Sequence, residues 1–309
     1  DLEFLKELSH HLTVEQQAQV ALRWAKYAME IGDYPATIVA AQAAIDLAQT
    51  IQQENFAAEG HLIWGQALLR QGEYSLAQSQ YERGLVLARQ TQSLRLEADC
   101  LNNLGGIFYD VGHYTAAQTH YEQALQIFRE IGDLRGESAS LNNLGMVCNE
   151  QGDHTTAKAY FGQALRIHQK TGNRRGECLV LGNLGTVAGA QGDYIEARSY
   201  QEQSLTIARE IGQRYFEGNA LINLGKVSLY LGDYEDAKDR FHTALAVFDQ
   251  TGHRTGESRA LGYLSLLSHH LSDDEAALAY GQQAQHILQE TGSQPVEGYV
   301  LTHVGHALT

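Results

Sequence analysis

The sequence predicts an all-α solenoid, and three observations support this prediction. One short segment recurs along the chain every 40 residues, and a fixed period of about 20 to 50 residues is typical of stacked supersecondary units. Within each period, apolar side chains occur twice at helical spacing. A glycine follows each of these two apolar segments, where it can end a helix in the left-handed conformation. Each period is therefore expected to form two helices.

The recurring segment is rich in leucine, asparagine and glycine. Its four copies are Leu101-Asn102-Asn103-Leu104-Gly105, Leu141-Asn142-Asn143-Leu144-Gly145, Leu181-Gly182-Asn183-Leu184-Gly185 and Leu221-Ile222-Asn223-Leu224-Gly225. The glycines that should end the first helix of a pair are Gly72, Gly112, Gly152, Gly192 and Gly232. Those that should end the second helix are Gly132, Gly172, Gly212, Gly252 and Gly292.

Local signals mark where helices begin. Thr13-Val14-Glu15-Gln16 is typical of a capping box and should start the first full helix. Pro35 and Pro295 each fall where a new helix should begin. We expect helix pairs near residues 13–51, 54–91, 94–131, 134–171, 174–211, 214–251 and 254–291, and then a final helix from about 294. Residues 1–12 are expected to be a leading helical segment or the remnant of a linker, and residues 13–309 a single array.

The residue pattern resembles the tetratricopeptide repeat (TPR) family over residues 13 to 309. The Trp/Leu-Gly signature is matched by Trp64-Gly65, Leu104-Gly105, Leu144-Gly145, Leu184-Gly185 and Leu224-Gly225. The small residue and the aromatic of the second helix are matched by Ala77, Ala117, Ala157, Ala197, Ala237 and Ala277, and by Tyr81, Tyr121, Phe161 and Phe241. The end repeats depart from the pattern, and Gln201 replaces the aromatic in mid-array. The resemblance implies a right-handed superhelix whose concave face is lined by the first helix of each pair.

Glycine-glutamate at the start of a first helix, as in Gly136-Glu137 and Gly176-Glu177, resembles two groups of long TPR arrays. One group is the kinesin light chains. The other is the C-terminal sensor arrays of bacterial STAND signal-transduction NTPases. The second resemblance implies a ligand-sensing module that controls an upstream nucleotide-binding domain of the same parent chain. Because the chain starts at Asp1 without a methionine, we expect it to be a piece of a longer bacterial protein.

Composition narrows the classes of partner. The net charge of −15 argues against nucleic acid, because phosphate binding needs a basic stripe, and favours a basic or neutral polypeptide. No apolar stretch approaches the ~20 residues that span a bilayer, so a cytoplasmic protein without a membrane partner is expected. Three cysteines without metal-ligand spacing are expected to be reduced, buried hydrophobes.

Four asparagines at one repeat position are the main candidates for ligand binding: Asn103, Asn143, Asn183 and Asn223. A side-chain amide both donates and accepts, so it can pair with the backbone of an extended peptide. Packed helices lie ~8–10 Å apart and an extended chain rises ~3.3 Å per residue, so one asparagine would meet about every third peptide residue. Asn102 and Asn142 could add contacts. The alternative is that these amides bond each other or neighbouring helix carbonyls and only stiffen the array.

Variable positions further along the first helices are expected to set specificity. They include Tyr109, Asp110, Asn149, Glu150, Lys226, Tyr230 and Tyr263. The groove is expected to run from an acidic end at Asp110 and Glu150 to an aromatic and histidine-rich end at Tyr230, Tyr263, His269 and His270. These residues favour a ligand with a basic portion and an apolar or aromatic portion.

Other functional classes find little support in the sequence. His269, His270, His303 and His306 could converge, but no metalloenzyme motif accompanies them. The repeated glutamates are interpreted as structural, with Arg95, Arg135 and Arg175 as available partners; they are Glu97, Glu137, Glu177, Glu217, Glu257 and Glu297. Gly225-Lys226 lacks the first glycine of a phosphate loop. We therefore expect no catalytic residue, metal or cofactor. The alternative to a ligand sensor is a structural or autoinhibitory scaffold that contacts upstream domains of its own parent protein or mediates assembly.

Overall fold

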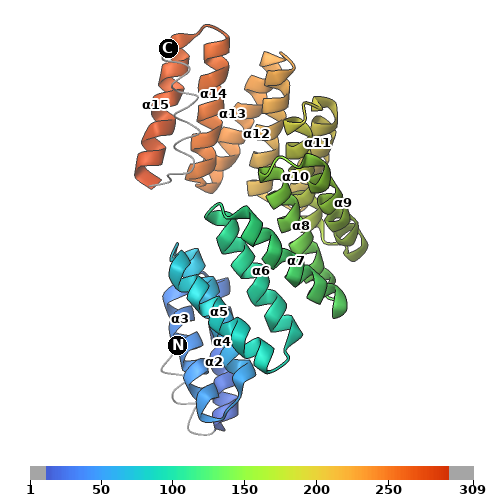
Figure 1. Cartoon of the computed structure of the whole chain (residues 1–309). Helices are drawn as coiled ribbons and strands as arrows, with labels where there is room; N and C mark the ends of the chain where they lie inside the picture. The colour runs from blue at the N-terminus through green and yellow to red at the C-terminus, as the bar shows by residue number, and fades with distance from the viewer. Residues whose placement is uncertain (1–11, 292–309) are drawn as a thin grey trace. The chain divides into compact units, whose positions relative to one another are not determined.

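The computed structural model describes residues 12–291, and within this range it contains fourteen α-helices and no β-strand (Figure 1). The prediction of an all-α solenoid with seven helix pairs is therefore confirmed. Several sequence predictions fall outside the described residues: the leading segment apart from Leu12, the final helix from about 294, Gly292, Pro295, Glu297, His303 and His306.

The chain divides into two compact units, residues 1–152 and 153–309. The first contains α2 (Val14–Glu30), α3 (Tyr34–Thr50), α4 (Glu54–Arg70), α5 (Tyr74–Gln90), α6 (Leu94–Asp110), α7 (Tyr114–Glu130) and α8 (Leu134–Glu150). The second contains α9 (His154–Thr171), α10 (Arg174–Ala190), α11 (Tyr194–Glu210), α12 (Arg214–Tyr230), α13 (Tyr234–Thr251), α14 (Arg254–His270) and α15 (Asp274–Thr291). Each unit is described by itself, and the single array over residues 13–309 stays a prediction.

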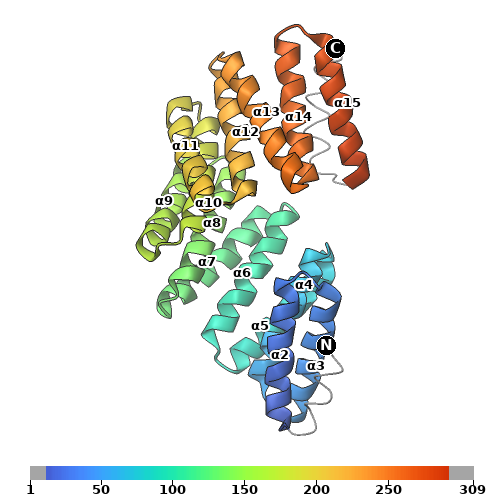
Figure 2. The same cartoon turned by 180° about the vertical axis from the view of Figure 1, so that it is seen from behind.

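Within each unit, consecutive helices pack against one another, as Figure 2 shows from behind. The first helices of successive pairs also touch: α2 with α4, α4 with α6 and α6 with α8 in the first unit, and α10 with α12 and α12 with α14 in the second. The signature glycine makes the close approach within a pair possible. A Cβ on Gly105 would lie 2.7 Å from a ring carbon of Tyr121, which is 3% exposed. The first helices therefore form one continuous face in each unit.

The helix ends follow the signals in the sequence. The Thr13 hydroxyl accepts from the backbone N–H of Gln16, whose side chain accepts in return, so the capping box is confirmed. Pro35 lies in the first turn of α3. The predicted glycine stops within the described range have φ between +65° and +81°. Where the glycine is missing, Gln52, Gln92 and Ser272 adopt the left-handed conformation instead.

The repeated glutamates form ion pairs at the junctions between helix pairs. Glu97 accepts from Arg89 at 2.8 Å and Glu137 accepts from Arg129 at 2.9 Å. The same junction recurs in the second unit, where Arg209 donates to Glu217 at 2.9 Å. The structural interpretation agrees with these contacts, but the partners differ from the predicted arginines. At these three junctions the arginine lies eight residues before its glutamate, at the end of the preceding helix. Glu177 and Glu257 instead pair with Arg174 and Arg254, three residues earlier in the same helix.

The three cysteines Cys100, Cys148 and Cys178 are free and buried, as expected. Burial raises the pKa of the Cys100 thiol to about 12, so it stays protonated and unreactive at neutral pH. None of the helices in residues 12–291 is long and apolar enough to cross a membrane.

Candidate functional site

Two adjoining hollows lie on the face that α10 and α12 form in the second unit. The larger has a volume of about 360 Å³ and the smaller of about 180 Å³. We call them together the α10–α12 groove, because four residues line both hollows: Thr186, Gln201, Asn223 and Lys226.

Asparagine side chains line the larger hollow. Asn183 of α10 and Asn223 of α12, two members of the predicted series, both face it, and Asn219 lies one turn before Asn223. Each amide offers two N–H donors and one carbonyl acceptor. The structure therefore brings two of the four predicted asparagines to one cavity.

Gln201 of α11 lies at the bottom of the groove and is 1% exposed. Its Nε2 donates to the carbonyl of Gly182 at 2.8 Å, whereas its Oε1 is buried and accepts no hydrogen bond from the described residues. Gly185 allows this packing, since a Cβ there would lie 2.5 Å from Nε2. A buried acceptor without a donor is costly. Gln201 Oε1 is therefore a buried acceptor next to the groove that no donor of the described residues satisfies.

Two cations line the same hollow. The Lys226 ammonium lies 5.7 Å from the centre of the Tyr263 ring, and Arg259 of α14 donates from Nη1 to Asn219 Oδ1 at 2.9 Å. Neither cation forms an ion pair with a carboxylate of the described chain. Burial lowers the pKa of Lys226, and the charge of Arg259 lowers it further. The groove is therefore locally positive in a protein of net charge −15.

The two candidate tyrosines of this unit have different environments. Tyr230 is 63% exposed and stacks on Tyr194 at 5.3 Å between ring centres, at one end of the smaller hollow. Tyr263 is 4% exposed and stacks on Phe241 at 5.2 Å. Tyr230 can therefore contact a ligand, whereas Tyr263 supports Lys226 from within the core.

In the first unit, the candidate asparagines bond to the protein itself. Asn103 donates to the carbonyl of Asp99 in its own helix at 2.7 Å. Asn143 donates to Asn102 Oδ1 at 3.3 Å, which links α8 to α6. Asn142 is 7% exposed, and its amide lies 3.6 Å from the sulfur of Met146. These contacts are those of the alternative interpretation, in which the amides stiffen the array.

The acidic candidates of the first unit lie at the ends of α6 and α8. Asp110 and Glu150 are exposed, while Tyr109 and Asn149 are partly buried. Burial raises the pKa of Tyr109 to about 12, with Glu150 as a second cause. Burial also raises the pKa of Asp110.

Asp99, at the repeat position of Asn219 and Arg259, gives a pH-dependent prediction. Burial raises its pKa from 3.8 to about 6, although Arg95 at 3.9 Å lowers it. Since the folded pKa is the higher one, the stability that the neutral form contributes is present below pH 3.8 and is lost as the pH rises through 6. Its side chain is 33% exposed, so the effect is moderated by solvent. We expect Asp99→Asn to raise the free energy of unfolding by about 1 kcal/mol near neutral pH and to leave it unchanged at low pH.

Urea unfolding at about pH 4.5 and about pH 7.5 measures this difference. Asp46→Asn, at an exposed site on α3, is the control and should leave the pH dependence unchanged. Equal effects of Asp99→Asn at both pH values would contradict the prediction.

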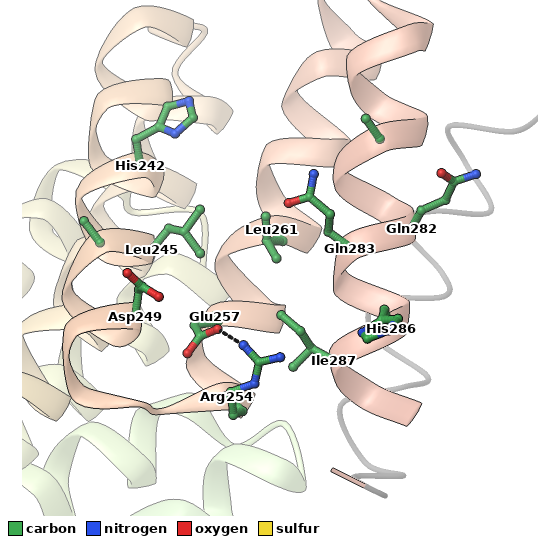
Figure 3. Close-up of a pocket in the computed structure, with 12 residues that line it drawn as sticks. His242, Leu245, Asp249, Arg254, Glu257, Leu261, Gln282, Gln283, His286 and Ile287 are labelled. Carbon is green, nitrogen blue, oxygen red and sulfur yellow. Dashed lines mark hydrogen bonds and ion pairs between the residues drawn. The ribbon is translucent and has the colours of Figure 1, made fainter. Parts of the chain in front are cut away.

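A larger cavity lies at the other side of the second unit, between α13 and α15 with α14 behind them (Figure 3). It has a volume of about 790 Å³, and its lining includes His242, Asp249 and His286. Arg254 and Glu257 form an ion pair at its lower end in Figure 3. Sequence reasoning missed it, because it considered only the first helices. Its lining includes no buried polar atom without a partner. We therefore consider the smaller α10–α12 groove the better candidate.

The histidines give no metal centre in the described range. His269 and His270 lie with ring centres 6.5 Å apart, and His269 lies 3.6 Å from Asp274. No group of three potential metal ligands was found among residues 12–291.

Two groove residues were missed by sequence reasoning, Asn219 and Arg259. Asn219 and Arg259 occupy one repeat position, four residues before Asn223 and Tyr263, and the preceding repeats hold Asp99, Ala139 and Leu179 there. The residue type at this repeat position varies along the chain, and this variation in the sequence could have identified both residues. A side chain there lies one helical turn from the asparagine and on the same face.

The tetratricopeptide repeat family model matches residues 56–130, 136–210 and 216–290. No curated protein sequence matches the chain. Among solved structures, BtubC (BKLC) from P. vanneervenii is 21% identical, with a TM-score of 0.59 over 78% of this chain and 93% of BtubC. A Rap protein complexed with Competence and Sporulation Factor is 17% identical, with a TM-score of 0.62 over 93% of this chain and 79% of the Rap chain.

A third similar structure is a signal transduction ATPase with numerous domains (STAND) from Pyrococcus horikoshii, which has a tetratricopeptide repeat sensor. It is 16% identical, with a TM-score of 0.62 over 94% of this chain. This chain spans about half the length of that protein, 49%. At these identities the structural matches show the fold.

Proposed function

Because this chain belongs to the tetratricopeptide repeat family, we propose that it is a binding module that captures an extended polypeptide in the α10–α12 groove. One observation carries the proposal: Asn183 and Asn223 line a single cavity whose floor holds the unsatisfied acceptor of Gln201. Amides that project from successive helices can pair with the N–H and C=O groups of a peptide backbone. Tyr230 adds an exposed aromatic surface at one end.

The finer part of the proposal concerns the parent protein. We propose that the module is the ligand-sensing part of a larger bacterial, cytoplasmic signalling ATPase, in which peptide capture biases an upstream nucleotide-binding domain. The similarity to the STAND protein with a tetratricopeptide repeat sensor and to the Rap complex supports this reading. The family is one of binding proteins, and the proposal assigns the chain no catalytic role.

A scaffold is the second candidate function. The cavity between α13 and α15 is lined mainly by these second helices, together with residues of α14. An autoinhibitory or assembly contact there would not involve Asn183 or Asn223. This candidate predicts that substitutions in the α10–α12 groove leave assembly unchanged.

The test uses a library of random peptides of about ten residues, long enough to pass several helices. Asn183→Ala combined with Asn223→Ala removes two amides that should each contribute about 1 kcal/mol to binding, so we expect roughly 30-fold weaker binding of the selected peptides. The matched control is Asn103→Ala combined with Asn143→Ala, whose amides already bond within the first unit. Peptides that bind both double variants equally, or no binding to the wild type, would contradict the proposal.

A further inference from the structure

We propose that the cavity between α13 and α15 binds a guanidinium group of a ligand, at the place where three other junctions of the chain hold an arginine of their own. This site is separate from the α10–α12 groove and goes beyond the proposed peptide capture. The argument begins with the residue eight positions before each repeated glutamate. In chain order these residues are Arg89, Arg129, Gln169, Arg209 and Asp249. At the last of these five junctions, an acidic residue stands in the place of the arginine.

The preceding junction shows what the arginine does. Glu217 is 5% exposed. Its Oε1 accepts from Arg209 at 2.9 Å, and its Oε2 accepts from Arg214 at 2.6 Å. Each oxygen of this largely buried carboxylate therefore has a cationic donor, as a charge removed from water requires.

Glu257 occupies the same repeat position and is also 5% exposed, but its pairing is incomplete. Its Oε2 accepts from Arg254 at 2.5 Å, and Arg254 also donates to Glu290 at 2.6 Å. None of the residues 12–291 donates to Glu257 Oε1. Because this oxygen is not sealed off by protein atoms and Glu257 lines the cavity, a cation in the cavity can reach it.

The exchange of arginine for Asp249 changes both the charge and the space at this junction. The formal charge of the side chain goes from +1 to −1, so Asp249 and Glu257 together exceed the single charge of Arg254. Aspartate is also much shorter than arginine, and both carboxylates line a cavity of about 790 Å³. In Figure 3 the two carboxylates lie at the lower end of this cavity, with Leu245 and Leu261 above them. The cavity therefore combines an excess of negative charge with room for a side chain.

A guanidinium fits this lining better than an ammonium does. It has five N–H donors in a planar fork, and it pairs with carboxylates in a bidentate manner that a lysine cannot match. Gln283 also lines the cavity and offers an amide oxygen. Leu245, Leu261 and Ile287 supply apolar walls for the methylene groups that carry a guanidinium.

The guanidinium has two possible sources, an arginine side chain of a polypeptide and a small guanidino compound. Residues 292–309 contain neither lysine nor arginine, so they do not supply it. The experiment compares four probes: a blocked pentapeptide with one arginine between alanines, its citrulline and lysine counterparts, and ethylguanidinium. Amide NMR shifts of α13, α14 and α15 in the full chain follow each titration.

We expect the arginine peptide to bind about 10-fold or more tightly than the citrulline peptide, which keeps the shape of arginine without its charge. A similar affinity of ethylguanidinium assigns a small guanidino compound as the source, whereas much weaker binding of ethylguanidinium assigns a polypeptide arginine. Equal affinities of the arginine, citrulline and lysine peptides, or no binding of any probe, would overturn the proposal.

Asp249→Arg and Asp249→Asn test the protein side. The arginine should fill the site and abolish binding of the arginine peptide, and the asparagine should weaken it roughly 5-fold through the loss of one charge. Asp239→Arg makes the same charge change at an exposed site of α13 and should bind the peptide as the wild type does. Asn183→Ala combined with Asn223→Ala should also bind it unchanged. Loss of binding in this double variant would place the peptide in the α10–α12 groove and overturn the second site alone.

A second readout does not depend on the ligand. Asp249→Arg should restore the ion pair that Glu97, Glu137 and Glu217 have, and should raise the thermal midpoint by roughly 2–4 °C. Asp239→Arg, as the control, should leave the midpoint unchanged. A higher midpoint together with lost binding marks a place where the chain omits a stabilising arginine that a ligand replaces. A lower midpoint in Asp249→Arg would show that the two junctions are not equivalent and would overturn the proposal.

Discussion

Phe248→Ala should lower the free energy of unfolding of the second unit by about 3–5 kcal/mol. The ring is fully buried at 0% exposed, and it lies against glycines on two neighbouring helices. A Cβ on Gly218 of α12 or on Gly256 of α14 would lie 2.4 Å from a ring carbon. The side chain therefore fills the space that both glycines leave, and alanine would open a cavity that neither helix can close.

Urea unfolding and hydrogen exchange together measure this effect, because repeat arrays can unfold in parts. Protection of the α12, α13 and α14 amides should fall, while that of the α2, α3 and α4 amides should not. Ile195→Ala, at a side chain that is 82% exposed, is the control and should change stability by less than about 0.5 kcal/mol. An equal loss of unfolding free energy in the two variants would show that the Phe248 ring does not contribute to stability through its packing between α12 and α14.

Gly225→Ala and Gly162→Ala should change stability in opposite directions. Both glycines lie inside helices of the second unit. A Cβ on Gly225 would lie 2.5 Å from a ring carbon of the buried Phe241, whereas on Gly162 it would meet only the end of Arg166 at 3.9 Å. We expect a loss of about 1–3 kcal/mol from overpacking at Gly225 and a gain of about 0.5–1 kcal/mol at Gly162.

Both substitutions add the same methyl group inside a helix, so a difference in stability between the two variants comes from the surroundings of each glycine. Thermal unfolding of both variants under one condition measures the sign. A gain at both positions would mean that α12 and α13 can separate without cost, and would contradict the packing at the signature glycine.

Much of the fold could be predicted because it depends on local signals that repeat. The glycines, the capping box at Thr13 and the apolar spacing each act within a few residues. Repetition along the chain reinforced the prediction for the glycines and for the apolar spacing. Side-chain partners were harder to predict. The choice of Arg89 for Glu97 depends on how two helices meet across a turn, which spacing along one helix does not reveal.

The candidate site was predicted in part for the same reason. Periodicity identified Asn183 and Asn223 as equivalent, and they do line one cavity. It also predicted that Asn103 would be equivalent to them, but that amide turns back to its own helix. Arg259 was missed because a periodic search emphasises what repeats, whereas the charge of this groove comes from residues that do not.

The ion pairs at the junctions bear on how such a chain can evolve. Arg89 with Glu97, Arg129 with Glu137 and Arg209 with Glu217 join one helix pair to the next with the same two groups at the same spacing. A duplicated repeat would meet its new neighbours through contacts that they already make. The chain could therefore gain or lose whole repeats by duplication or deletion without a new interface, while substitutions on α10, α12 and α14 would change the side chains of the groove independently of the number of repeats.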